Sequence, residues 1–166
     1  SPTLTTITED QTGNAGQTVT SFMGTITDPD GALMPKGIAI TGTTGTSGTW
    51  EYSLDGITWS ALTASASSSL LLRPNDYIRF VPDGLNAGSG TITYRAWDQT
   101  TGSAGSTVNP GAGDGTTAFS TTENTASLTT TAVNDAPTLG SGTLAAVSED
   151  TASPAVYART SAPRIV

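Results

Sequence analysis

Apolar and polar residues alternate along much of the chain, in short runs separated by turn-forming residues. The run Thr91–Asp98 is the clearest, because Ile92, Tyr94 and Ala96 share one face of an extended chain. No run of useful length has the 3.6-residue period of an amphipathic helix. We predict strands over Thr3–Thr8, Thr18–Thr27, Gly37–Thr43, the two arms of 49–62, Ser69–Arg73, Tyr77–Pro82, Thr91–Asp98, Thr117–Ser120 and Ala126–Val133.

The two arms of 49–62 form the clearest hairpin signal in the sequence. Trp50 and Tyr52 alternate with polar residues on the first arm, and Trp59 lies on the second. Asp55-Gly56 between the arms is a dipeptide typical of a two-residue type I′ turn. We therefore predict a tight hairpin in which the return strand begins directly after Gly56.

Strands spaced in this way, without helices, predict an all-β protein. Turn clusters recur about every 8–12 residues, which is typical of two antiparallel sheets packed face to face. We expect a Greek-key β-sandwich of about seven to nine strands.

The opening of the chain recurs near its end. Ser1-Pro2-Thr3-Leu4 is followed by Ile7-Thr8-Glu9-Asp10, and Ala136-Pro137-Thr138-Leu139 is followed by Val147-Ser148-Glu149-Asp150. The two openings are 135 residues apart, a period that indicates whole domains in tandem rather than small repeats. We predict one complete module over residues 1–135 and the first strand of a following module within 136–166.

The composition argues against several classes of function. The net charge of −8 disfavours nucleic-acid binding, which needs a basic surface, and permits divalent cations. The chain has no His and no Cys, so the common nucleophilic triads and zinc sites are absent, and we expect no enzyme. No apolar run is long enough to cross a membrane. We expect an extracellular or cell-surface protein whose secretion signal lies outside this stretch.

Several short motifs resemble the cadherin-like, immunoglobulin-type tandem repeats of large bacterial surface proteins, including RTX-type adhesins. They are "AVNDAP" at the predicted domain junction, "DPDG" after the second strand, "YRAWD" late in the domain, and "GTWEYSLDGITW" with "LRPNDYIRFVP". The resemblance implies an immunoglobulin/cadherin-like sandwich that serves as a structural extender in a cell-adhesion, biofilm or matrix protein. In that family, adjacent repeats are partners and Ca²⁺ stiffens the junctions between them.

The resemblance also implies which residues would bind Ca²⁺. We call the end from which the chain leaves the module the downstream end. The family's Ca²⁺ ligands at that end are matched by Glu9 with Asp10 and by Asn134 with Asp135. The family's ligands at the opposite, upstream end are matched by three aspartates. The nearest match to one further acidic ligand position of the family is Asp83. The upstream aspartates are Asp28, Asp30 and Asp98.

Physical chemistry supports this assignment, and an alternative stays open. Ca²⁺ takes 6–8 oxygen ligands, and clustered carboxylates repel each other when no cation is bound. Aspartate is equally a turn-forming residue, so these side chains could simply close turns at strand ends. Because a junction site draws ligands from two modules, we expect incomplete sites in this chain.

Two other functions remain open at this point. Trp97 lies on the opposite face of its strand from Ile92, Tyr94 and Ala96, so we expect it to be the most exposed tryptophan. A carbohydrate-binding module would use it to contact surface glycans. Alternatively, the 136–166 segment donates a strand to a neighbouring copy, which would build an extracellular filament.

Overall fold

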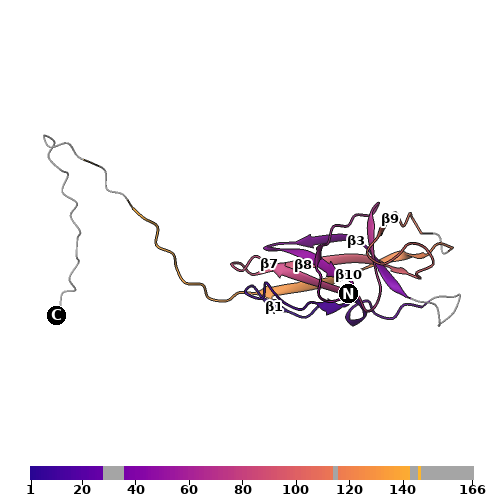
Figure 1. Cartoon of the computed structure of the whole chain (residues 1–166), viewed down its shortest axis with the longest axis horizontal. Coiled ribbons are helices and arrows are strands. Elements are labelled where there is room, and N and C mark those ends of the chain that lie inside the picture. Colours follow the sequence, from indigo (N-terminus) through magenta and orange to yellow (C-terminus); the bar gives the residue numbers. More distant parts are fainter. Residues whose placement is uncertain (28–35, 114–115, 143–145, 147–166) are drawn as a thin grey trace, which may run out of the picture. The chain divides into compact units, whose positions relative to one another are not determined.

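The structure is a computed structural model that describes residues 1–27, 36–113, 116–142 and 146. The chain divides into two units, Ser1–Asp135 and Ala136–Val166. Within the described residues, strands dominate and the only helical element is a single 3₁₀ turn (Figure 1). The prediction of an all-β protein is confirmed.

Unit 1 contains two sheets. The large sheet has the strand order β1-β10-β8-β3-β6-β9, and the small sheet has the order β2-β7-β4-β5. The large-sheet strands are β1 (Ile7–Thr8), β3 (Gly37–Gly45), β6 (Ser69–Leu72), β8 (Gly88–Trp97), β9 (Thr107–Val108) and β10 (Phe119–Thr131). The small-sheet strands are β2 (Gln17–Thr18), β4 (Gly48–Ser53), β5 (Ser60–Ala61) and β7 (Tyr77–Pro82).

The main core lies between the two sheets. Alternate residues of the large sheet, such as Ile40, Ile92 and Leu128, pack in one buried cluster with Trp50 and Phe80 of the small sheet. The rings of Trp50 and Phe80 meet edge to face, with centroids 5.0 Å apart. Two sheets joined by a shared apolar core are compatible with the predicted β-sandwich.

The large sheet is also covered on its outer face near the upstream end. Ala39, Leu71, Trp97, Ala118 and Phe119 form a second buried cluster there. As a result, all four residues of β6 are buried. A strand with one face in water would instead alternate between buried and exposed residues.

Two predicted elements are wrong in detail. The run Thr18–Thr27 is a strand only at its start, because β2 gives way to a 3₁₀ turn over Val19–Ser21. Val19 and Phe22 are both buried, and their spacing of three suits a helical turn better than a strand. The connection between β4 and β5 spans residues 54–59 and is not the predicted two-residue turn. Asp55 Oδ1 accepts the N–H groups of Ile57 and Thr58, which holds this wider turn.

The last predicted strands are also joined differently. Thr117–Ser120 and Ala126–Val133 belong to one strand, β10, which pairs with β8 along most of its length. The register shifts between Phe119 and Glu123, where Ser120 Oγ accepts the Ala96 N–H and donates to the Thr122 carbonyl. This irregularity lets one strand continue where turn residues predict a break.

Candidate metal site at the downstream end

The downstream end of unit 1 is where β10 ends beside β1. Thr8 pairs with Thr131 in a parallel arrangement, and Thr130 pairs with Gly88 at the start of β8. The next residue after β1 is Glu9, whose N–H donates to the Thr131 carbonyl at 3.0 Å. The backbone therefore fixes Glu9 against the outgoing chain.

Glu9 is a buried carboxylate. Only 2% of its surface is exposed, although the residue lies at a chain turn. Its Oε1 accepts the Val133 N–H at 2.6 Å. Its Oε2 is equally buried and has no hydrogen-bond partner among the described residues. Burying a carboxylate oxygen without a hydrogen-bond partner costs free energy, and no described residue offsets that cost at Oε2.

The other downstream residues do not close a cage around this carboxylate in the part of the chain that the structure describes. Asp10, Asn134 and Asp135 are exposed, and the Asn134 Nδ2 donates only to the neighbouring Asp135 carbonyl. In the described part of the chain, no three acidic, His or Cys residues are close enough together to hold a metal ion. Glu9 and the Asn134-Asp135 pair are thus joined only through Val133.

Asp83 lies at the same end but is used in its own turn. Its backbone N–H donates to the Ser47 carbonyl, and its Oδ1 accepts the N–H groups of Leu85 and Asn86 at 2.9 Å. The Leu85 N–H and the Asn86 contacts lower the pKa of the Asp83 carboxyl. This geometry matches the turn-forming role of aspartate.

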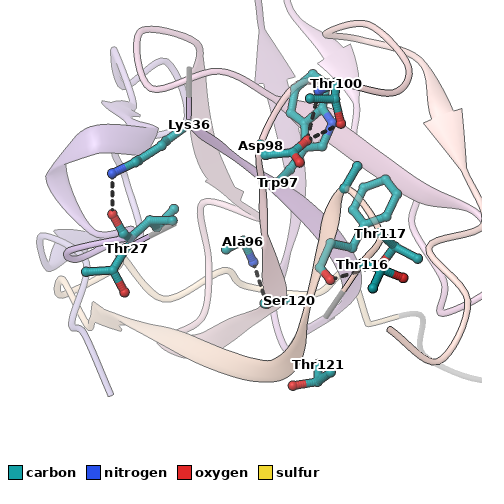
Figure 2. A pocket seen from close by; sticks show the side chains of 13 residues that line it. Thr27, Lys36, Ala96, Trp97, Asp98, Thr100, Thr116, Thr117, Ser120 and Thr121 are labelled. Atoms are coloured by element: carbon teal, nitrogen blue, oxygen red, sulfur yellow. Dashed lines mark hydrogen bonds between the residues drawn. The ribbon is translucent and has the colours of Figure 1, made fainter. Parts of the chain in front are cut away.

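At the upstream end, two of the three predicted residues lie outside the described part of the chain. These are Asp28 and Asp30. Asp98 is described, and its Oδ1 accepts both the N–H and the hydroxyl of Thr100. Asp98 lines an open pocket of about 460 Å³ together with Thr27, the residue before Asp28 (Figure 2).

A positively charged side chain also lines this pocket. Lys36 lines it, and its Nζ donates to the Ile26 carbonyl at 2.7 Å (Figure 2). Most other polar groups of the pocket are hydroxyls of threonine and serine. The described residues of this pocket do not form a metal site.

The prediction that Trp97 is exposed is wrong. The ring faces the outer side of the large sheet as its position in the strand requires, but it is only 2% exposed because the second cluster covers it. Its Nε1–H donates to the Thr101 carbonyl at 2.8 Å, and the ring packs over Gly37. A buried ring offers no face to a sugar, so this structure does not provide the predicted glycan contact.

Sequence reasoning missed one partly exposed aromatic group. The Trp59 ring lies 4.1 Å from the guanidinium carbon of Arg79, and Arg79 forms an ion pair with Glu51 at 2.6 Å. The signal available in the sequence was the alternation of β4 and β7, which places Glu51 opposite Arg79. This arrangement stabilises the outer face of the small sheet.

Comparisons of the chain with models of protein families, with curated proteins and with solved structures gave no match. In the residues that the structure describes, no helix has the length and apolar character needed to cross a membrane.

Proposed function

We propose that this chain is a structural extender repeat of a large bacterial cell-surface or secreted adhesin, without enzymatic activity. Its partners are adjacent repeats of the same protein. The 135-residue restart of the sequence supports a tandem array, and the two sheets are compatible with a Greek-key, cadherin-like module. Such a repeat holds a distal binding domain away from the cell.

In this proposal, Ca²⁺ at the downstream end stiffens the junction with the next repeat. The observation that carries it is Glu9. Its Oε2 is buried and has no partner in the described residues, while its Oε1 accepts the Val133 N–H of the outgoing chain. A cation beside Oε2 would neutralise the carboxylate and draw in oxygens from Asn134 and Asp135. The linker would then leave the module in one direction instead of many.

The experiment is thermal unfolding of the full chain with Ca²⁺, with Mg²⁺ and with a chelator. Ca²⁺ should stabilise the wild type by about 2.7 kcal/mol when its free concentration is 100 times the Kd, and the chelator should reverse the effect. Mg²⁺ should stabilise less, because it demands a smaller, octahedral oxygen cage.

Two variants locate the site. Glu9→Gln keeps the acceptor for the Val133 N–H but removes the charge, so the Ca²⁺-dependent increment should disappear. Glu123→Gln is the matched control, because Glu123 is paired with Arg95 on the sheet surface and its loss should leave the increment intact. Equal increments in Glu9→Gln and the wild type would refute Ca²⁺ binding at Glu9.

A further inference from the structure

A small cavity lies within unit 1, between the segment that leads into β1 and the start of β2. Its volume is about 140 Å³. Trp50, Phe80 and Leu128 form its floor; they belong to the main core, and each is at most 5% exposed. Thr5, just before β1, and Gln17 of β2 lie at its rim. The volume is close to the roughly 150 Å³ of an engineered apolar cavity that binds one benzene molecule.

The charged and amide groups at one side of the rim are already bonded within the protein. The Arg79 guanidinium donates to Glu51 Oε2 at 2.8 Å and to the Asn14 carbonyl at 3.2 Å. Asn14 Nδ2 donates to the Phe80 carbonyl at 2.8 Å, and Asn14 Oδ1 accepts the Gly16 N–H at 3.1 Å. Because these groups are engaged, a charge on a ligand would find no partner here, and the cavity suits an uncharged molecule.

One polar group of the rim is held only weakly. Gln17 Oε1 accepts the N–H and the hydroxyl of Thr5, each at 3.4 Å, which is longer than an ordinary hydrogen bond of either type. Gln17 Nε2 has no hydrogen-bond partner among the described residues. The amide can therefore exchange a weak contact for a stronger one with a ligand hydroxyl, which both donates and accepts.

We propose that this cavity binds a small, uncharged phenol. The aromatic ring enters between the two sheets and lies against Trp50 and Phe80, and the ligand hydroxyl bonds the Gln17 amide at the rim. One ring fills the volume, so larger aromatic molecules are excluded. The inference uses neither Glu9 nor a metal ion and stands apart from the Ca²⁺ proposal.

Titration of the full chain with phenol, followed by methyl NMR, tests the site. We expect saturating shifts at the methyl groups of Ile7, Ile78 and Leu128, all of which line the cavity. A Kd on the order of 1 mM is reasonable for a ligand of about seven heavy atoms. The methyl groups of Val108, which packs against the outer cluster, should not move. Shifts that fail to saturate, or that are equally large at Val108, would overturn the proposal.

A pair of phenylalanine variants tests the location. Thr5→Phe places a ring at the mouth of the cavity, and because this ring is part of the chain it competes at a high effective concentration. Phenol binding should weaken at least tenfold. Thr6→Phe is the matched control, since Thr6 is exposed like Thr5 but does not line the cavity, and it should bind phenol as the wild type does. Equal affinity of Thr5→Phe and the wild type would show that phenol binds elsewhere.

Comparison of phenol with benzene tests the role of the ligand hydroxyl. Gln17→Leu keeps an apolar side chain at the rim but removes the amide. The ratio of phenol affinity to benzene affinity should therefore fall about fivefold relative to the wild type, the typical net effect of one hydrogen bond. An unchanged ratio would overturn the contact with Gln17 and, with it, the preference for a phenol.

Discussion

Two glycines in neighbouring strands should respond in opposite directions to the same substitution. Gly90 in β8 lies under the aromatic pair of the core. A Cβ atom at this position would lie 2.8 Å from Trp50 Cζ2, closer than real Cβ atoms approach another atom, and 3.1 Å from Phe80 Cε2, which is tighter than most real Cβ contacts. Gly42 in β3 has no atom within 4 Å of the corresponding point.

The size of the effect follows from how little the aromatic pair can move. The Trp50 Nε1–H is bonded to the Thr44 carbonyl at 2.7 Å, and Phe80 is 1% exposed. Overpacking a core of this kind costs about 1–3 kcal/mol, so Gly90→Ala should destabilise the protein by about 2 kcal/mol. Gly42→Ala should stabilise it by about 0.5 kcal/mol, because alanine restricts the unfolded chain.

Thermal or urea unfolding of the two variants measures this difference. A gap of about 2.5 kcal/mol corresponds to roughly 10 °C in Tm for a domain of this size. The urea m-value should be unchanged in both variants, which shows that only native packing is altered. If Gly90→Ala were as stable as Gly42→Ala, the two sheets could not enclose Trp50 and Phe80 in the way described.

Two further predictions concern acid stability and the outer cluster. The carboxyl of Asp55 has a pKa well below its usual range, mainly because it accepts the N–H groups of Thr58 and Ile57, and that of Asp83 is lowered too. Both groups therefore add stability above the unfolded pKa of about 4 that is lost as the pH falls through the folded values. Urea unfolding from pH 6 to pH 2 should show this loss, and Asp55→Asn should make it shallower; an unchanged slope would contradict the role of Asp55. Trp97→Ala should cost about 3–5 kcal/mol because the ring is buried. A loss below 1 kcal/mol would mean that the ring is exposed, as its place in the sequence had indicated.

The sequence predicts the strands with one solvated face well. In β7, Ile78 and Phe80 are buried while their neighbours are half-buried, so the period of two appears directly in the residue pattern. In Val19–Met23, Val19 and Phe22 are buried and Met23 is partly buried, a spacing of three and four, and the β-branched composition concealed that turn. Propensity alone therefore overestimated the second strand.

Burial that comes from distant segments could not be predicted. The alternation predicts the correct face of the sheet for Trp97. Only the fold shows that this face is covered, because Phe119 of β10 belongs to the same buried cluster as Trp97 and Val108 of β9 packs against that cluster. Glu9 is a similar case, since a Glu-Asp pair after a strand is typical of an exposed turn. Its buried carboxylate instead accepts the N–H of Val133, which is 124 residues away in the sequence.

The parallel pairing of β1 with β10 has a mechanical consequence. The first strand enters the sheet beside Ser127 and both strands run towards the downstream end. A tensile force applied between Ser1 and Asp135 pulls the two strands past each other along their length. The hydrogen bonds of Leu4, Ser127 and Glu9 then bear the load together in shear, whereas an antiparallel terminal pair would open one bond at a time. Unit 1 should therefore resist unfolding most strongly when it is pulled between its first and last residues.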